Sequence, residues 1–429
     1  MIGVMRWPVA ASIALACAGC DVVYGLHRDD AGIDAADATT SDGPMPYECN
    51  TIATLNDRFD TDELATWWPD SFGGTGSISV SNGRVVLDTV TENSYATLDS
   101  RYYYDIRDRA FTLAITDDGN VPASSYVNVA LFADTPDRSL TIQRTMGKLR
   151  FLVHDGLSDS VVTEVPYSAA QHAYLRISVT ASSVAFSTSA DGVAFVVQGS
   201  RPLTGMHFVR ATVQVHRPTG AVPFVVYVDE VGDGGPRSPA CPFDALRDDF
   251  STGTLDPQWA RSNAIFGQVQ VDSGTLLAIT NGVPSGNTAD VALRSASAFD
   301  LEGHAVTIEI PQMIMNSVQK QVKVNVFAVT GDTVGFQQQN GMLSLSAQRG
   351  TTTLNPYTGP YSATTMRWWR IRNAAGTTYW DVSPDGVAWT ELSSTTALVG
   401  LDRASLDVRV YSAASDEDRA RFDNINATP

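Results

Sequence analysis

The residues best suited to chemistry are an aromatic side chain and an arginine, two positions apart, that occur twice. Tyr174 and Arg176 form the first pair, and Trp368 and Arg370 form the second. Apolar residues fill the alternating positions, and side chains two apart in a strand share a face, so we predict that both pairs point outward. An aromatic plane covers the apolar face of a sugar ring, while an arginine donates to hydroxyls or to an acidic sugar's carboxylate. The pattern predicts a glycan-binding surface in each copy.

Two further polar residues interrupt an otherwise apolar alternation in a later strand. Gln214 lies in TVQV and Arg409 in DVRV, and we predict that both side chains also point outward. We therefore add them to the candidate ligand-binding residues. The alternative is that a loop packs over this face and that the arginines merely hold an aspartate.

The strands that would carry these residues follow from short apolar runs bounded by turn pairs. Examples are VSNGRVVLDTV (80–90), YVNVALFAD (126–134) and FVVYVDEV (224–231). Alternation of period two without a sustained helical stripe predicts antiparallel strands and an all-β fold. Recurrent strand and turn signals favour large sandwiches over a small barrel.

An internal repeat predicts that this fold occurs twice. LNDRF (55–59) matches LRDDF (246–250), and Trp68 matches Trp259 at the same shift. Further matches continue at nearly constant shifts to the end of the chain, which indicates a duplicated domain. We predict a signal peptide at 1–19, a linker at 20–48, and two tandem antiparallel β-sandwich domains at 49–240 and 241–429.

The repeat also explains a recurring Asp-Gly dipeptide. Asp191-Gly192 and Asp385-Gly386 each lie between apolar strands, where two-residue hairpins favour this sequence, as they favour Asn82-Gly83 and Asn340-Gly341. A calcium site needs several further oxygen ligands at close spacing, which the flanking residues lack. We interpret the dipeptides as turns and predict no bound metal.

The N-terminus carries an export signal. Arg6 precedes an apolar segment, WPVAASIALACA (7–18), that is too short to span a bilayer. Ala-Gly before Cys20 resembles the bacterial lipoprotein cleavage signal, although Cys17 stands where that signal usually has Leu. The resemblance implies lipid on Cys20 and an anchor in a bacterial membrane, periplasmic or at the cell surface. Lipidation of Cys17 and secretion without lipid are the alternatives.

The charge and the cysteine content indicate which binding partners and which covalent links to expect. The net charge of −18 is spread along the chain, and no basic segment predicts nucleic-acid binding. The acidic segment 20–48 has few large apolar residues and is predicted to be a flexible tether. Cys49 and Cys241 are the remaining cysteines, and an even pair in an exported chain favours a disulfide over a zinc site.

Three motifs carry a resemblance to a known fold family. DDFSTGTLDPQW (248–259), SPDGVAW (383–389) and RFDNI (421–425) resemble concanavalin A-like (laminin G-like) jelly rolls, most closely the non-catalytic modules attached to bacterial polysaccharide-degrading enzymes. Domain 1 matches more weakly. The resemblance implies that the first and last strands of a domain pair, at 55–59 and 225–231, which would bring Cys49 and Cys241 together.

The same resemblance raises the question of catalysis. Catalytic members of the fold cleave glycans with two carboxylates, which must be an even number of residues apart to share one face of a strand. No such run exists, the histidines are scattered, and no motif for a cofactor is present. We predict that the chain is not an enzyme. Two functions remain: binding of a polysaccharide or surface glycan, or a structural role in contact with an envelope protein.

Overall fold

The computed structural model describes residues 50–60, 64, 68, 76–117, 121–133, 138–156, 158–232, 240–284, 286–314, 317–396 and 398–427. The predicted signal peptide and linker, Cys20 and Cys49 lie outside them. The described elements are β-strands and two short 3-10 turns, η2 (Ile52–Thr54) and η3 (Phe243–Ala245), which confirms the all-β prediction. Within this part of the chain, no helix is long and apolar enough to cross a membrane.

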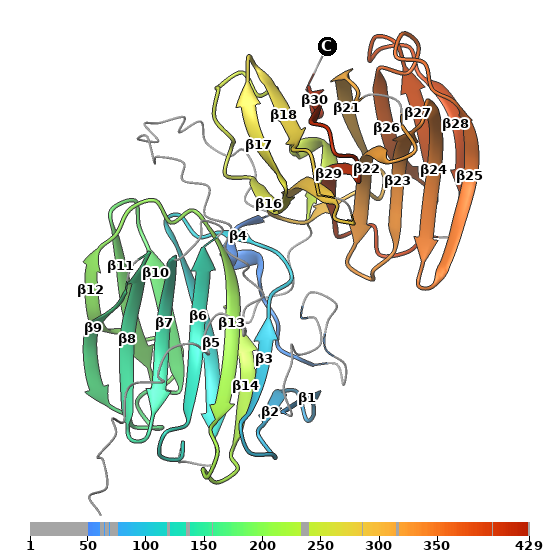
Figure 1. The fold of residues 1–429 in the computed structure, drawn as a ribbon. Helices are drawn as coiled ribbons and strands as arrows, with labels where there is room; N and C mark the ends of the chain where they lie inside the picture. The colour runs from blue at the N-terminus through green and yellow to red at the C-terminus, as the bar shows by residue number, and fades with distance from the viewer. Residues whose placement is uncertain are drawn as a thin grey trace, which may run out of the picture. The chain divides into compact units, whose positions relative to one another are not determined.

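The N-terminal sandwich consists of two antiparallel sheets, seen as two layers of strands in Figure 1. Sheet I has the order β1 (Ser77–Val80), β2 (Val85–Asp88), β14 (Val225–Val231), β5 (Arg109–Asp117), β10 (Tyr174–Val179), β11 (Ser183–Ser189) and β12 (Val196–Pro202). Sheet II has the order β3 (Ser94–Asp99), β13 (Phe208–Arg217), β6 (Tyr126–Ala133), β7 (Arg138–Thr145), β8 (Lys148–Asp155) and β9 (Asp159–Pro166), and β4 (Tyr104–Asp105) also pairs with β13.

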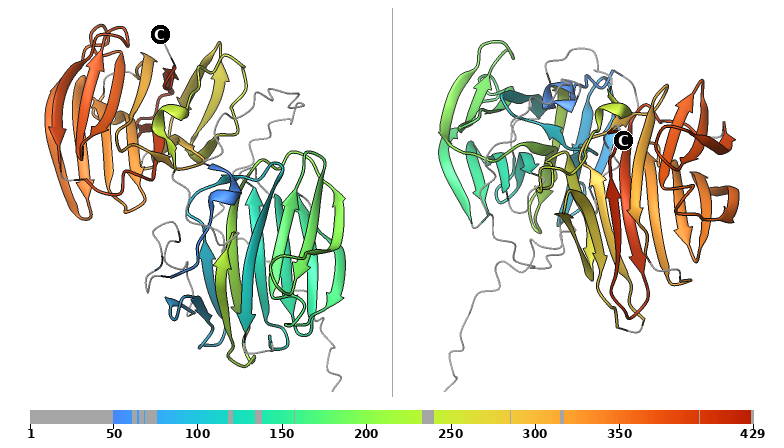
Figure 2. Two further views of the ribbon diagram at one scale, coloured as in Figure 1. Left: turned by 180° about the vertical axis from the view of Figure 1, so that it is seen from behind. Right: turned by 90° about the horizontal axis from the view of Figure 1, so that it is seen from above.

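The C-terminal sandwich also has two sheets, which are antiparallel except for one short parallel pair at the edge of sheet III, and Figure 2 gives two further views. Sheet III has the order β15 (Cys241–Pro242), β20 (Phe299–Asp300), β29 (Ala404–Ser412), β22 (Lys320–Ala328), β23 (Thr333–Gln339), β24 (Met342–Arg349) and β25 (Thr352–Pro360), while β16 (Trp259–Ile265) pairs with β19 (Ala289–Ser295) and β19 with β29. Sheet IV has the order β17 (Gly267–Asp272), β18 (Thr275–Thr280), β30 (Asp418–Asp423), β21 (Ala305–Gln312), β26 (Trp368–Ala374), β27 (Thr377–Ser383) and β28 (Thr390–Thr395). The domain boundaries at 49 and 241 remain predictions.

Aromatic rings join the two layers of each sandwich. The ring centroids of Phe151 on β8 and Phe186 on β11 are 5.6 Å apart, and those of Phe336 on β23 and Trp369 on β26 are 5.0 Å apart. All four side chains are buried. Burying one such ring stabilises the fold by about 2 kcal/mol, so these contacts contribute substantially to holding the sheets together.

Each copy has the same contact between an aspartate and a tryptophan near its start. The indole nitrogen of Trp68 donates to Asp57 Oδ2 at 2.9 Å, and that of Trp259 donates to Asp248 Oδ2 at 2.7 Å. Asp57 also forms an antiparallel bridge with Val231, so the expected pairing of the first segment with the last strand is present as a single bridge. Cys241 is disulfide-bonded, and its pairing with Cys49 stays a prediction.

The predicted turn dipeptides divide into two kinds. Asn82-Gly83 and Asn340-Gly341 have positive φ at both residues, between 52° and 72°, as a type I′ turn requires. The Asp-Gly prediction is wrong in detail, because residues 190–195 separate β11 from β12 and Asp191 does not have positive φ. These segments are longer loops, not two-residue hairpins.

Each Asp-Gly loop is held by its aspartate, in the same way in both copies. Asp191 Oδ1 accepts hydrogen bonds from the backbone N–H groups of Val193 and Ala194 at 2.9 and 3.0 Å. Asp385 Oδ1 accepts the equivalent pair, both at 2.9 Å. These bonds favour the ionised carboxylate, so they lower the pKa of Asp385 and lower that of Asp191 to about 2.

The depressed pKa values predict a pH dependence of stability. Both loops are fully stabilised above the ordinary aspartate pKa, and this stabilisation is lost as the pH falls toward 2. The free energy of unfolding, measured by urea denaturation at pH 5 and 2.5, should therefore decrease less in Asp191→Asn/Asp385→Asn than in the parent. Asp402→Asn, which removes an exposed carboxylate outside these loops, should leave the decrease unchanged. Equal decreases in parent and double variant would contradict this account.

Candidate functional site

A row of polar side chains crosses the outer face of sheet II. Strand pairing places Asn128 of β6 between Gln214 of β13 and Gln143 of β7, and Gln143 beside Arg150 of β8. The apolar neighbours of these residues point to the core, as Val213 does, so the row faces away from it. We name it the N-terminal row: Thr97, Gln214, Asn128, Gln143, Arg150 and Glu164.

Hydrogen bonds link the exposed half of this row. Gln143 Nε2 donates to Asn128 Oδ1 at 3.2 Å, and Arg150 Nη1 donates to Gln143 Oε1 at 3.1 Å. Glu164 pairs with Lys148 at 2.6 Å and with Arg150 at 3.5 Å. The contacts orient two amides and a guanidinium side by side. Amides donate and accept at once, which matches the hydroxyl groups of a sugar.

Two stacked rings lie beside the N-terminal row. Tyr126 and His216 are register partners on β6 and β13, two residues from Asn128 and Gln214 on the same face. Their ring centroids are 4.8 Å apart with an interplanar angle of 24°. Burial lowers the pKa of His216, so its imidazole is neutral at pH 7. The face thus combines aromatic surface with aligned hydrogen-bonding groups.

The outer face of sheet III carries the equivalent row. Arg409 of β29 lies beside Lys323 of β22, Lys323 beside Gln337 of β23, and Gln337 beside Ser344 of β24. Arg409 thus takes the place of Gln214, and Lys323 that of Asn128. We name it the C-terminal row: Ala292, Arg409, Lys323, Gln337, Ser344 and Thr358.

Carboxylates neutralise the arginines near the C-terminal row. Arg409 pairs with Asp290 at 3.1 Å and with Asp407 at 3.2 Å. Arg294 also pairs with Asp407 at 3.2 Å, and the Asp407 side chain is fully buried. A buried carboxylate requires such partners to offset its desolvation. The network thus holds both arginine side chains against carboxylates of the same sheet.

The aromatic and arginine pairs predicted from the sequence lie on the other layers, sheets I and IV. Arg176 lies 3.4 Å from the ring centroid of Phe195, and Arg370 lies 4.2 Å from that of Trp389. Arg370 Nε also donates to the buried Asp381 at 2.8 Å. Both guanidinium groups are covered by an aromatic residue at the end of an Asp-Gly loop. For Arg370 this is the alternative in which the arginine holds an aspartate beneath a loop, whereas Arg176 donates to Thr112 Oγ1 at 3.0 Å.

The predicted exposure of Trp368 is wrong, since the side chain is only 4% exposed. Its register partners, Glu309 on β21 and Ser383 on β27, are buried as well. Alternation fixes the face of the sheet to which a side chain points, whereas its exposure depends on the neighbouring strands. Tyr174 also packs over its loop, because a Cβ on Gly192 would meet its ring at 2.8 Å.

The six predicted ligand-binding residues do not form one site. Gln214 and Arg409 lie on sheets II and III, in the polar rows, and Gln214 is itself only 4% exposed. The remaining four lie on the opposite layer of each sandwich: Tyr174, Arg176, Trp368 and Arg370. Strand order is what separates the two groups, and it cannot be read from alternation within a strand. Ligand binding by any of the six stays a prediction.

A pair of carboxylates that sequence reasoning missed lies on sheet IV. Glu309 of β21 and Asp423 of β30 are register partners. Glu309 forms an ion pair with Arg367 and accepts a hydrogen bond from Asn424 Nδ2 at 2.5 Å. Burial, together with the nearby Glu309 charge, raises the pKa of Asp423 to about 6. Asp423 therefore retains a proton at mildly acidic pH beside a second carboxylate that is ion-paired with Arg367.

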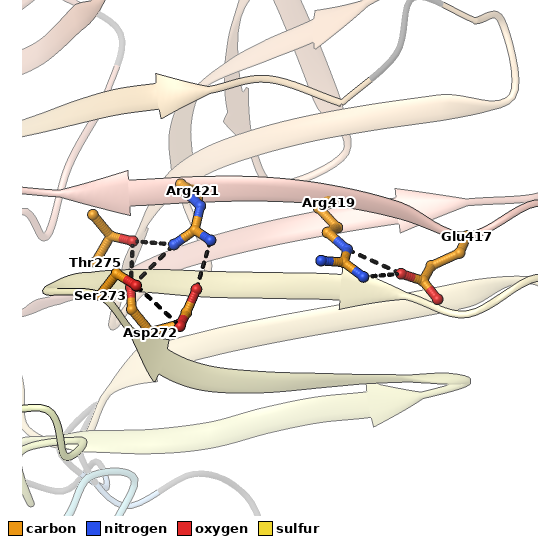
Figure 3. Close-up of polar contacts among 6 residues, drawn as sticks. All are labelled: Asp272, Ser273, Thr275, Glu417, Arg419 and Arg421. Atoms are coloured by element: carbon orange, nitrogen blue, oxygen red, sulfur yellow. Dashed lines mark hydrogen bonds and ion pairs between the residues drawn. The ribbon is translucent and has the colours of Figure 1, made fainter.

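Two arginines on the same face of β30 have partners of their own (Figure 3). Arg421 donates to Asp272 Oδ2 at 2.6 Å and to Thr275 Oγ1 at 2.7 Å. Arg419 donates to Glu417 Oε1 at 2.7 Å. These cations are thus already engaged beside Asp423. Among the described residues, no group of three or more His, Cys, Asp or Glu side chains is arranged to hold a metal ion.

Solved structures of known proteins resemble part of this chain. No protein-family model matches the chain, and no curated protein matches it. The Bacillus licheniformis β-glucanase is 12% identical over 41% of this chain and 95% of its own, with a TM-score of 0.34. A β-1,3-1,4-glucanase (lichenase) from a mouse hindgut metagenome is 12% identical over 42% and 96%, with a TM-score of 0.33. The Rhodothermus marinus laminarinase is 8% identical over 42% and 95%, with a TM-score of 0.33.

These matches correct the prediction that the chain is not an enzyme. The similar structures are, by their names, glucanases and a laminarinase, and the likeness to non-catalytic modules in particular stays a prediction. At this identity the likeness shows the fold alone, and no activity or substrate is carried over. The prediction rested on the absence of two carboxylates on one face of a single strand. Glu309 and Asp423 meet through the pairing of two strands that are far apart in the sequence.

Proposed function

We propose that the chain binds carbohydrate on the outer faces of sheets II and III. The observation that carries this proposal is the pair of equivalent polar rows. In each row, strand pairing aligns three neighbouring side chains whose amide, guanidinium or ammonium groups can hydrogen-bond to a ligand. Such groups match sugar hydroxyls, which both donate and accept. A structural role in contact with an envelope protein is the alternative, and the binding assay below distinguishes the two.

Loss of the central amide in both rows should weaken binding. Gln143→Ala/Gln337→Ala removes about 1 kcal/mol per lost hydrogen bond, so affinity for any polysaccharide that the parent binds should fall about fivefold per row. Affinity electrophoresis of the mature protein against a panel of neutral and acidic polysaccharides measures this. Gln198→Ala, which removes a glutamine from sheet I, is the matched control. A parent that no polysaccharide retards, or a variant equal to the control, would contradict the proposal.

Glycan hydrolysis is a second candidate function, favoured by the carboxylates on sheet IV. A glycosidase needs one carboxylic acid that donates a proton and one ionised partner. Asp423, with its pKa raised to about 6, has the property of the first, and Glu309, which forms an ion pair with Arg367, lies beside it as the second carboxylate. The distinct environments of the two groups set the division of roles.

If this pair is catalytic, both members are required. Asp423→Asn and Glu309→Gln should each lower the release of reducing ends from β-glucans at least 100-fold, as for other acid and base catalysts. The parent rate should fall as the pH rises through about 6, because Asp423 must be protonated to donate. The control is Asp229→Asn on β14, since Asp229 is the counterpart of Asp423 in the first copy and Ala114 stands in place of Glu309. No release by the parent, or full activity in either variant, would exclude this function.

We further propose that the mature chain begins at Cys20, is anchored by lipid to a bacterial membrane, and carries a Cys49–Cys241 disulfide. The signal sequence supports the first two statements, and the disulfide-bonded state of Cys241 supports the third. Peptide mass mapping without reduction should find at least two acyl chains on Cys20, because one alone anchors only marginally. It should also find Cys49 and Cys241 in one linked peptide. An unmodified N-terminus elsewhere, or a free Cys49, would contradict the respective statement.

A further inference from the structure

One cation in the C-terminal row is left without a carboxylate of its own. Lys323 lies near the middle of sheet III, between Arg409 and Gln337. Its side chain is half-buried, and within the described part of the chain its ammonium group has neither a hydrogen bond nor an ion pair. A desolvated ammonium normally requires an anionic partner.

The carboxylates near Lys323 form ion pairs with arginines instead. Asp290 binds Arg409, and Asp407 binds both Arg409 and Arg294. They act on Lys323 through space but do not contact it, and its pKa is lowered chiefly by burial and secondarily by the charge of Arg409. The row therefore contains an ammonium group that no carboxylate among the described residues contacts, between a guanidinium and an amide. An added anion would be stabilised beside it.

Other lysines on the sheets are paired, which sets Lys323 apart from them. Lys148 binds Glu164 at 2.6 Å, and Lys320 binds Asp416 and Asp418 at 2.8 and 3.0 Å. In the N-terminal row, the place of Lys323 is taken by Asn128, a neutral residue that accepts a hydrogen bond from Gln143. The uncompensated cation is thus a property of the second copy's row and not of the duplicated fold.

We propose that the outer face of sheet III binds the carboxylate of an acidic sugar residue within a glycan, with Lys323 as the charge partner. Gln337 and the neutralised Arg409 lie on either side, where they would donate to the neighbouring hydroxyls. An ammonium group is a compact point charge that selects for negative charge more than for shape. This inference rests on the proposed glycan binding and names the class of sugar for the second copy.

Binding of the mature protein to polygalacturonate and to its fully methyl-esterified form tests the inference, because the two polymers differ in charge on the same backbone. The parent should bind the acidic polymer at least tenfold more tightly. Lys323→Met should remove this preference, Lys323→Arg should retain most of it, and Arg201→Met, which removes a cation from β12 of sheet I, should leave it unchanged. Lys323→Met should be at least as stable to urea as the parent, since it removes a desolvated charge.

The outcomes separate this inference from the proposal on which it rests. A parent that binds neutral polysaccharides but shows no preference for the acidic form overturns the acidic-sugar inference alone. A preference that survives in Lys323→Met, or that is lost equally in Arg201→Met, overturns the role of Lys323. A parent that binds no polysaccharide overturns both the inference and the proposed function.

Discussion

Burial of alternate apolar side chains between two sheets determines where every polar side chain on those strands must point. Val213 and Val215 are buried, so Gln214 between them faces away from the core, and Val322 and Val324 impose the same direction on Lys323. Strand pairing then brings outward residues of neighbouring strands into line. The polar rows are thus consequences of core packing. Any substitution that shifted the pairing of a strand by one residue would point its polar side chains into the core and its apolar side chains outward.

Local features of the fold could be predicted from the sequence, whereas contacts between distant strands could not. The alternation predicted the strand around Gln214, and Asn340-Gly341 predicted a type I′ turn, because both depend on neighbouring residues alone. The layer that holds Trp368, and its burial, depend on strand order and on Glu309 beside it. The pairing of Glu309 with Asp423 arises in the same way.

Duplication kept the structural contacts and changed the exposed chemistry. The same hydrogen bond occurs in both copies, between Trp68 and Asp57 and between Trp259 and Asp248. The rows differ in charge: Asn128 is neutral where Lys323 is cationic. Positions that hold the fold together tolerate little change, whereas outward positions are free to acquire different ligands.

The central claim is that sugar binds the outer faces of sheets II and III and not the opposite layers. A crystal structure of the mature protein with an oligosaccharide from a polymer that it binds tests this most directly. We expect sugar hydroxyls within hydrogen-bond distance of Gln143 or of Gln337 and Lys323. A sugar ring seated instead on sheet I or IV, against Arg176 or Arg370, would contradict it.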